Sequence, residues 1–477
     1  MPHITRVLAV PATGAYYSED LAALQSTFIP LPDRYTARPV TPGFAAVRQV
    51  AEAVSIGLVL DDGRVAWGDC VAVAYSAKSG RDPVFRCQDG LDTIQRVVAP
   101  ALQGRTLTSF RELTAEIDAL VESVQVTQKK RIGEGTLSRR ELFQSPARLW
   151  QALQREDRTG PAVEIEEQAT VQQRLHTAVR YGISQALLQA VALARSVTMA
   201  EVIAEEWNLP RPDAPVPIHA QSGGERYHNA DKMIVRRVAS LPHALVDDTL
   251  RAEQLGEDGS LLVQYVRWLS ERIAQLGGAR GAYHPTIHLD VHGALGQICQ
   301  NDLGHVLGQL YALAQAAQPY PLRVECPVMM DNRQAQIEAI KTLREYTRFR
   351  KMKVQLVADE WANTLDDIRA FIEAGAADMI HIKMPDLGSV HNSVEAVLAC
   401  KAGGMGAFLG GSCAETDLSA RVSVHVALAT RPDIVMAKPG MGVDEGIMLA
   451  QNEMARTLAG ISLSTNPQGA VPDANLH

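Results

Sequence analysis

The segment VQLVADEWANTLDDIRAFIEAGAADMIHIK, residues 354–383, contains one complete strand–helix–strand unit. Residues 354–358 form a short apolar run that stops at Asp359, as is typical of a buried strand. Residues 363–374 then carry apolar side chains at helical spacing, and residues 379–383 form a second short apolar run. Two such runs joined by a helix predict neighbouring parallel strands, because parallel strands need a crossover connection of this kind.

The same alternation recurs through the second half of the chain. Repeating the unit seven or eight times within about 250 residues predicts a closed, TIM-type β/α barrel. A doubly wound sheet is the other option, but no G-x-G-x-x-G follows a predicted strand, and the glycines of residues 440–446 have the wrong spacing. We therefore favour the barrel. Its predicted strands are residues 217–221, 286–291, 322–326, 354–358, 379–383, 407–409 and 434–437.

The chain has 477 residues, which is long enough for two domains. Near its start, the apolar run 55–60, the turn Asp61-Asp-Gly63 and the run 65–67 have the pattern of a β-hairpin. Helical patterning covers residues 175–205, and a proline-rich stretch at 208–217 then marks a domain boundary. We predict an N-terminal α+β capping domain over residues 1–209 with an insertion near 121–173, a catalytic barrel over 210–465, and a frayed C-terminal tail over 466–477.

The insertion differs in composition from the rest of the capping domain. It contains Lys129-Lys-Arg131 and many mixed polar residues, and only Ser145 followed by Pro146 has the pattern of a helix start. We expect a mobile subregion with one short helix at that point.

Composition and charge exclude several classes of protein. Hydrophobic residues make up 46% of the chain and charged residues 21%, which is typical of a packed globular protein. A net charge of -8 offers no attraction for nucleic acid, and no apolar stretch reaches the roughly 18 residues of a membrane helix. The N-terminus lacks a signal-peptide pattern, so we expect a cytoplasmic protein with small-molecule partners. Six cysteines without C-x-x-C spacing indicate reduced thiols.

Charged residues end four successive predicted strands, about one strand and one helix apart. They are Asp290, Glu325, Asp359 and Lys383. Barrel active sites lie at the C-terminal ends of the strands, so these side chains are expected around one axis. Three adjacent carboxylates would raise one another's pKa unless a cation held them ionised, and Mg²⁺ prefers oxygen ligands. We therefore predict a Mg²⁺ site, with helix capping as the alternative for any one acid alone.

Further motifs follow one another over nearly the whole chain outside the insertion. They are Gly68-Asp-Cys70, Ser79-Gly-Arg-Asp-Pro83, Arg174-Leu-His-Thr-Ala178, Arg180-Tyr-Gly182, Ala220-Gln-Ser-Gly223, Leu241-Pro-His-Ala244, His288-Leu-Asp-Val291, Val357-Ala-Asp-Glu-Trp361, Ile382-Lys-Met-Pro-Asp-Leu-Gly388, Gly410-Gly-Ser-Cys413 and Ala437-Lys-Pro-Gly-Met-Gly-Val-Asp-Glu-Gly446. In this order they resemble the methylaspartate ammonia-lyase family of the enolase superfamily. The resemblance implies an N-terminal capping domain, a modified β/α barrel, and Mg²⁺ on Asp290, Glu325 and Asp359.

The same resemblance implies a reaction. Ammonia or an amine would leave an aspartate-type amino acid reversibly, through an enolate that the metal stabilises. Lys383 would be the base for one face of the reacting carbon. His243 would be the base for the opposite face or a clamp on the metal-bound carboxylate. A monovalent cation such as K⁺ is considered as a second ion, and a homodimer is expected.

The substrate-binding residues implied by the resemblance include one departure from the family pattern. Gln221, with Ser412 and Cys413, would bind the other substrate carboxylate. His381 stands where the family usually has glutamine. It could still donate to a carboxylate, but it adds a group that can titrate.

Two further departures concern the amine side of the substrate. Ala74 replaces a glutamine, and Met436 replaces a leucine. Loss of the amide opens volume and removes a polar contact. We therefore expect N-substituted aspartates to be substrates alongside 3-methylaspartate.

Other activities remain as alternatives. His288, Asp290 and His292 alternate along one strand, as in zinc-dependent barrel hydrolases, but positions i and i+4 of a strand lie about 13 Å apart. Dehydration or epimerisation by another enolase-type enzyme is the stronger rival, although Lys351-Met-Lys353 precedes the wrong strand for the usual K-x-K pattern. A noncatalytic binding protein would leave Lys383 and the acids without a use.

Overall fold

The computed structural model describes residues 2–26, 36–132, 163–244, 246, 254–278 and 283–465. Contacts between Cα atoms divide the chain into two compact units. The larger unit combines residues 1–118 with residues 176–477, and the smaller unit consists of residues 119–175.

The larger unit begins with a three-stranded antiparallel sheet in which β2 pairs with both β1 and β3. Gly63, with a φ of +83°, lies in the tight turn between β2 and β3, so the predicted hairpin is confirmed. The predicted helical segment is present as α7 and α8, which are separated at Ser196 in a left-handed conformation. The elements of this region are β1 (Ile4–Glu19), α1 (Leu21–Ser26), β2 (Arg48–Leu60), β3 (Val65–Cys70), α2 (Cys87–Thr93), η2 (Ile94–Val98), α3 (Ala99–Leu102), α4 (Phe110–Asp118), α7 (Thr177–Arg195) and α8 (Met199–Glu206).

Helix α7 packs against β3 through a pair of glycines. A Cβ atom on Gly68 would lie 2.1 Å from the carbonyl oxygen of Gly182, and a Cβ atom on Gly182 would lie 2.4 Å from the backbone nitrogen of Cys70. No side chain fits between backbones this close. The contact accounts for the glycine in each of two sequence motifs, Gly68-Asp-Cys70 and Arg180-Tyr-Gly182.

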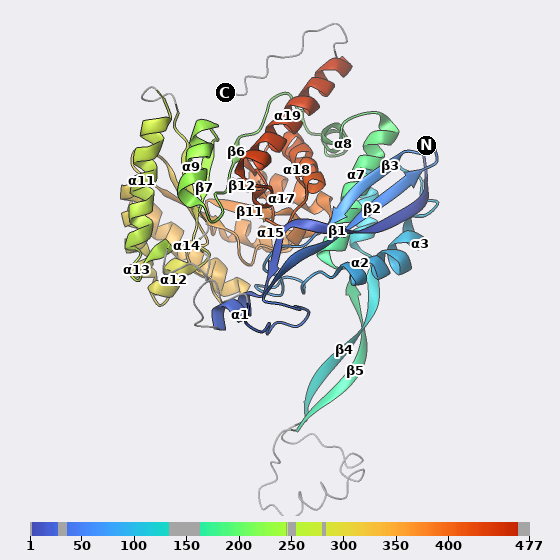
Figure 1. Ribbon diagram of the computed structural model, residues 1–477, viewed down its shortest axis with the longest axis horizontal. Coiled ribbons are helices and arrows are strands. Elements are labelled where there is room, and N and C mark those ends of the chain that lie inside the picture. Colours follow the sequence, from blue (N-terminus) through green and yellow to red (C-terminus); the bar gives the residue numbers. More distant parts are fainter. Residues whose placement is uncertain are drawn as a thin grey trace, which may run out of the picture. The chain divides into compact units, whose positions relative to one another are not determined.

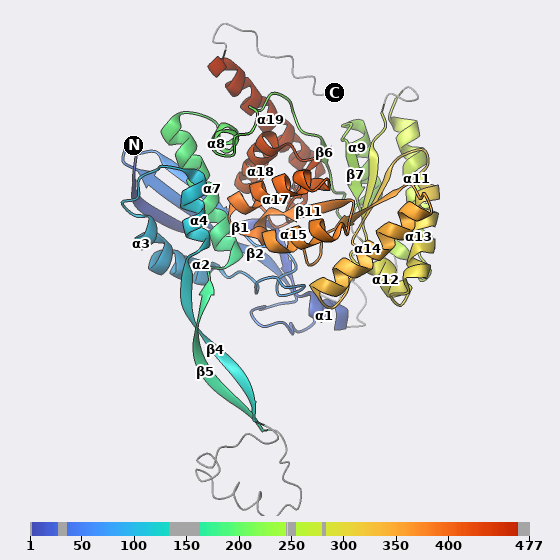
Figure 2. The ribbon, with the colours of Figure 1, turned by 180° about the vertical axis from the view of Figure 1, so that it is seen from behind.

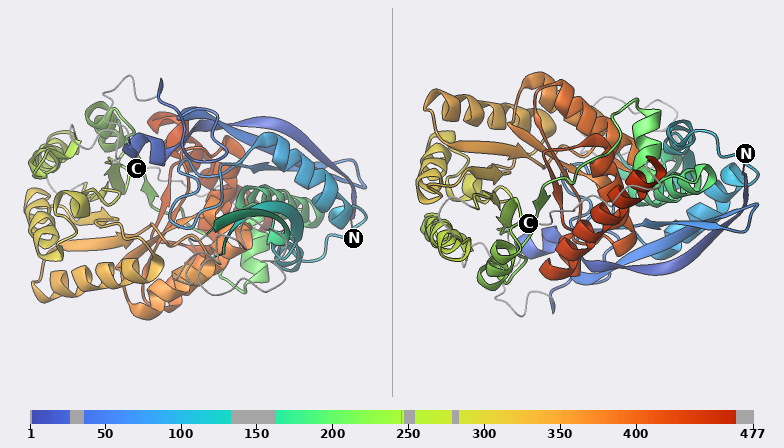
Figure 3. Two further views of the ribbon diagram at one scale, coloured as in Figure 1. Left: turned by 90° about the horizontal axis from the view of Figure 1, so that it is seen from below. Right: turned by 90° about the horizontal axis from the view of Figure 1, so that it is seen from above.

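Eight parallel strands close into a barrel in the order β6 to β13, with β13 paired to β6, so the predicted barrel is confirmed and a doubly wound sheet is excluded. Helices lie outside the strands, as the yellow, orange and red elements of Figures 1, 2 and 3 show. The strands are β6 (Ile218–His219), β7 (Ser240–His243), β8 (Thr286–Asp290), β9 (Leu322–Glu325), β10 (Val354–Ala358), β11 (Met379–Lys383), β12 (Gly406–Gly410) and β13 (Ile434–Met436). The helical elements are α9 (Arg226–Val235), α11 (Ser260–Leu276), α12 (Ala294–Ile298), α13 (Leu303–Ala316), α14 (Arg333–Phe349), α15 (Leu365–Ala374), α16 (Met384–Leu387), α17 (Val390–Ala402), α18 (Asp417–Thr430), η3 (Pro439–Met441) and α19 (Val443–Thr465).

Seven of these strands overlap the predicted ones, and β7 is the strand that the sequence did not reveal. Pro242 lies inside β7, where it opposes His288 of β8. Proline is rare in central strands, so the segment lacked the expected pattern. Buried apolar side chains from four neighbouring strands form one cluster of the barrel core: Val357, Met379, Phe408, Ile434 and Met436.

The smaller unit contains an antiparallel strand pair. β4 (Val121–Ile132) pairs along its whole length with β5 (Val163–Arg174). The sequence did not predict these strands, because their polar residues are typical of a solvated segment rather than a half-buried strand. The expected helix start at Ser145 and the tail over 466–477 lie outside the described residues.

Two further expectations concern the cysteines and membrane helices. All six cysteines are free thiols, and Cys70, Cys299, Cys326 and Cys400 are buried. Among the described residues no single helix is long and apolar enough to span a membrane. Helices α7 and α8 are long and apolar enough only when they are taken together, and the chain bends by 92° between them.

The glycine contact predicts the effect of one added methyl group. We expect Gly182→Ala to lower the free energy of unfolding by about 1–3 kcal/mol, because α7 must move away from β3 to admit the Cβ atom. Gly308→Ala is the matched control, since Gly308 lies in α13 and, among the described residues, nothing beyond its own helix backbone lies within 4 Å of an added Cβ. The control should be stabilised by about 0.5–1 kcal/mol. Urea unfolding measures both values, and equal effects would contradict the role of the glycine pair.

Candidate active site

The four charged side chains predicted at strand ends lie together. Register between β8 and β9 places Asp290 opposite Glu325, and Glu325 in turn lies opposite Val357 of β10, two residues before Asp359. Lys383 Nζ donates a hydrogen bond to Asp359 Oδ2 at 2.7 Å. Asp290, Glu325 and Asp359 are 4%, 0% and 2% exposed, so their charges depend on local partners rather than on water.

The carboxylates need a positive partner. Burial, together with the charges of Asp290 and Asp359, raises the pKa of Glu325 well above its usual value. The Oδ1 atom of Asp359 is buried and has no hydrogen-bond partner among the described residues. A divalent cation would satisfy this oxygen and relieve the repulsion. The donor set therefore fits Mg²⁺.

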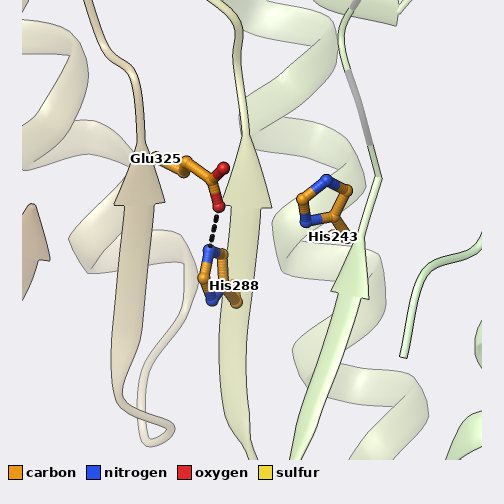
Figure 4. Close-up of side chains that lie close together, drawn as sticks. All are labelled: His243, His288 and Glu325. Carbon is orange, nitrogen blue, oxygen red and sulfur yellow. Dashed lines mark hydrogen bonds and ion pairs between the residues drawn. The ribbon is translucent and has the colours of Figure 1, made fainter. Parts of the chain in front are cut away.

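Neutral histidines contact both oxygens of Glu325. His288 Nε2 lies 2.8 Å from Oε2, and His381 Nδ1 lies 2.7 Å from Oε1. Figure 4 shows His288 directed toward Glu325 from the neighbouring strand, with His243 nearby on the next strand. Burial lowers the pKa of His288 well below the usual value and lowers the pKa of His381 to about 3. His381 is therefore neutral near pH 7.

Lys383 is charged in this arrangement. Burial disfavours the ammonium group, but Asp359, Glu360 and Asp386 outweigh burial and raise the pKa of Lys383 above its usual value. A lysine held in this way can donate a proton, and it can accept one only after its acidic partner is neutralised.

His243 belongs to a chain of buried polar groups. Its Nε2 atom lies 3.4 Å from Asp290 Oδ2, and its Nδ1 atom lies 3.2 Å from His219 Nε2. His219 Nδ1 in turn lies 2.9 Å from Ser240 Oγ. Burial opposes the charged form, but the contact with Asp290 and the charge of Glu325 raise the pKa of His243. The imidazole is thus fixed by contacts at both nitrogens.

A pocket lies at these strand ends and brings together most of the predicted site residues. Glu325 and Asp359 are buried next to it. Ser412 donates its backbone N–H to Glu415 Oε2 at 2.8 Å, and Lys438 Nζ lies 2.9 Å from the same oxygen, which anchors the loop after β12. Burial raises the pKa of Cys413 to about 12, so its thiol is protonated. The pocket is lined by Val73, Ala74, Tyr75, Arg81, Gln221, His243, Asp290, His292, His381, Lys383, Gly411, Ser412, Cys413 and Met436.

Arg81 is the functional candidate that sequence reasoning missed. Its Nη1 atom lies 2.7 Å from Glu360 Oε2, and its Nε atom lies 2.8 Å from Asp386 Oδ2. Glu360 directly follows Asp359, and Asp386 lies three residues after Lys383. The Arg81 side chain is 3% exposed, so this N-terminal residue joins the turn after β10 to helix α16 through buried ion pairs. Arg81 falls within Ser79-Gly-Arg-Asp-Pro83, but no sequence pattern identifies the distant acids it meets.

The hydrolase alternative is not supported by the geometry. His288 faces Glu325, whereas His292 Nε2 lies 3.4 Å from Glu360 Oε1. No group of possible metal ligands among the described residues contains both histidines.

The closed barrel and the acids at its strand ends define a β/α-barrel enzyme, and comparison with known proteins identifies its family. Family models described as "Methylaspartate ammonia-lyase N-terminus" and "Methylaspartate ammonia-lyase C-terminus" match residues 2–133 with 150–208, and residues 210–462. Methylaspartate ammonia-lyase 2 of Carboxydothermus hydrogenoformans is 43% identical over 96% of this chain and 98% of its own length. The enzyme of Clostridium tetanomorphum is 40% identical over the same shares. The chain belongs to the methylaspartate ammonia-lyase family of carbon–nitrogen lyases.

Solved structures agree with this assignment. A magnesium complex of β-methylaspartase from Clostridium tetanomorphum superposes with a TM-score of 0.79 at 39% identity, covering 97% of this chain and 100% of that one. The Citrobacter amalonaticus methylaspartate ammonia lyase containing (2S,3S)-3-methylaspartic acid superposes with a TM-score of 0.81 at 39% identity, covering 96% and 100%. Muconate cycloisomerase from Pseudomonas fluorescens, at 15% identity and a TM-score of 0.53 over 89% and 84%, shares the fold.

The buried ion pairs of Arg81 predict a strong effect of a conservative substitution. We expect Arg81→Lys to lower kcat/KM by about a hundredfold and to lower the free energy of unfolding by about 3–5 kcal/mol, because one ammonium group cannot bridge both acids. Arg333→Lys is the matched control, since Arg333 is 49% exposed and pairs with Asp367 at the surface. Steady-state kinetics and thermal unfolding measure both variants. A variant of Arg81 that behaves like the control would contradict the predicted role.

Proposed function

We propose that this enzyme eliminates ammonia or an amine reversibly from 3-methylaspartate and from N-substituted aspartates, through an enolate. The observation that carries the proposal is the contact between Lys383 and Asp359 beside two further buried acids, in a chain of this family. The acids Asp290, Glu325 and Asp359 would hold Mg²⁺. When bound, Mg²⁺ would neutralise these carboxylates and stabilise the negative charge that develops on a substrate carboxylate.

Lys383 and His243 move protons in the proposed reaction. Both line the pocket. Lys383 takes the proton from the carbon next to the side-chain carboxylate once Asp359 no longer holds the ammonium form. His243 acts from the other direction, either as the base for the opposite stereoisomer or as a donor to the substrate carboxylate. Its contacts with His219 and Asp290 keep the ring in one orientation.

The far side of the pocket would bind the second carboxylate of the substrate. Gln221, Ser412 and Cys413 line the pocket and offer amide, hydroxyl and thiol donors. Because the Cys413 thiol is protonated, it serves as a donor rather than a nucleophile. His381 lies on the metal side with its Nδ1 atom against Glu325.

The amine of the substrate would lie near Ala74 and Met436. Both line the pocket, and their side chains end in apolar carbon or thioether groups. An ammonium group gains little from such neighbours, whereas an alkyl substituent on the amine fills the space. This difference favours substituted amines.

The remaining expectations complete the proposal. Residues 1–209 act as the capping domain and 210–465 as the catalytic barrel. The protein works as a cytoplasmic homodimer, with a monovalent cation such as K⁺ as a second ion.

Isotope exchange tests the assignment of the bases and the metal. We expect Lys383→Ala to slow deuterium incorporation at the carbon next to the side-chain carboxylate by about 10²- to 10⁴-fold for one stereoisomer of 3-methylaspartate. His243→Ala should affect mainly the other stereoisomer or the binding of the carboxylate. Nuclear magnetic resonance in D₂O measures the exchange, with Lys232→Ala as a control at a partly exposed lysine that pairs with Asp444.

The same assay addresses Mg²⁺. Exchange should stop after exhaustive chelation and in Asp290→Ala, Glu325→Ala and Asp359→Ala, because each substitution removes one oxygen ligand. Full exchange without metal, or unchanged exchange in Lys383→Ala, would reject the mechanism.

Amine preference is tested at Ala74. In the addition direction we expect the native enzyme to use methylamine at least as readily as ammonia. Ala74→Gln should shift the ratio of kcat/KM values toward ammonia by about tenfold to a hundredfold, because the amide restores one polar contact and fills the space. Ala74→Leu is the matched control, since it fills the space without the amide. If neither substitution changes the ratio, residues other than Ala74 set the amine preference.

A further inference from the structure

A nitrogen donor lies among the acids at the strand ends. His381 Nδ1 is 2.7 Å from Glu325 Oε1 and 3.8 Å from Asp359 Oδ1. One ligand atom from each of these three buried residues lies within 4.8 Å of the other two. Ligand atoms at about 2.1 Å from one ion are about 3 Å apart when adjacent and about 4.2 Å apart when opposite. The distances from His381 Nδ1 to the two acids, 2.7 and 3.8 Å, lie close to these ligand–ligand distances, so the three residues are near enough to share a single ion.

The His381 ring is held where it can ligate. It stacks on Phe408 with ring centroids 4.2 Å apart and planes at 21°. A Cβ atom on Gly410 would lie 1.9 Å from His381 Nε2, so the ring fills the space that a side chain at position 410 would need. A ligand held in this way gives up little conformational freedom when it binds an ion.

We propose that His381 is itself a ligand of the metal centre, next to Glu325 and Asp359, and that its nitrogen makes the centre bind Mn²⁺ and Co²⁺ in preference to Mg²⁺. The proposal rests on the carboxylate site of the proposed function and adds one nitrogen to it. Imidazole is a good ligand for first-row transition ions, whereas Mg²⁺ is bound mainly through oxygen. His381 thus changes which ion the centre selects.

A second group of possible ligands offers another source of the nitrogen ligand. It consists of His243, His288 and Glu325, the residues drawn in Figure 4. This group contains only one of the three acids proposed to bind the metal. An ion in this second group would also occupy His243, which the proposed function uses to move a proton. The group around His381 contains two of the acids proposed to bind the metal, so we assign the nitrogen to His381.

Electron spin echo spectroscopy of Mn²⁺ bound to the full-length metal-free protein tests this assignment. The native protein should show modulation from a directly coordinated ¹⁴N nucleus. His381→Gln should lose this modulation, while His305→Gln should keep it, because His305 is 79% exposed on α13. By calorimetry, His381→Gln should weaken Co²⁺ binding by about tenfold or more and change Mg²⁺ binding much less.

The outcomes separate this inference from the proposed function. Mn²⁺ binding without ¹⁴N modulation, or modulation that survives His381→Gln and disappears in His243→Gln, would overturn the role of His381. If Glu325→Gln and Asp359→Ala still abolish Mn²⁺ binding in that case, the carboxylate site stands. Unchanged Mn²⁺ binding in both acid variants would overturn the site and the inference together.

Discussion

Three carboxylates, Asp290, Glu325 and Asp359, are buried side by side at the mouth of the barrel. Because they repel one another, the surrounding residues must supply positive charge or hydrogen bonds. Burial removes the solvation that normally keeps carboxylates charged, so positive or hydrogen-bonding partners must replace it. Lys383 supplies a charge to Asp359, and His243 contacts Asp290. Two neutral histidines contact the two oxygens of Glu325. An oxygen of Asp359 still lacks a hydrogen-bond partner among the described residues. A bound cation would be stabilised most strongly at this oxygen.

The N-terminal region completes the site from outside the barrel. Arg81 neutralises Glu360 and Asp386, the acids that follow the metal-side aspartate and the lysine. The close approach of β3 and α7 at Gly68 and Gly182 fixes the sheet that precedes Arg81 in the chain. Ala74 and Tyr75 line the pocket from the same region. Residues before the barrel therefore contribute to both the electrostatics and the lining of the pocket.

Elements with a clear local sequence pattern were predicted, and elements without such a pattern were missed. Seven barrel strands and the β2–β3 hairpin have runs of apolar residues or a tight-turn motif that single-sequence reasoning detects. β7 lacks such a run because it contains Pro242, and β4 and β5 are rich in polar residues. These strands depend on their pairing partners. One partner of β7 is β8, more than 40 residues later in the sequence, and β4 and β5 pair with each other. The raised pKa of Lys383 has a related origin, since Glu360 and Asp386 lie near the lysine only in the folded chain.

The sequence by itself determined the barrel, the family and the positions of the acids and the lysine, because strand period and strand-end placement are local properties that repeat along the chain. Only the tertiary structure decided which neighbours these residues have. The contacts of Arg81 with Glu360, of His219 with His243, and of His381 with Glu325 join residues on different elements. Charge state and ring orientation depend on those neighbours at distances of a few ångströms. Such distances are set by the closure of the barrel and by the packing of the N-terminal region, not by spacing in the sequence.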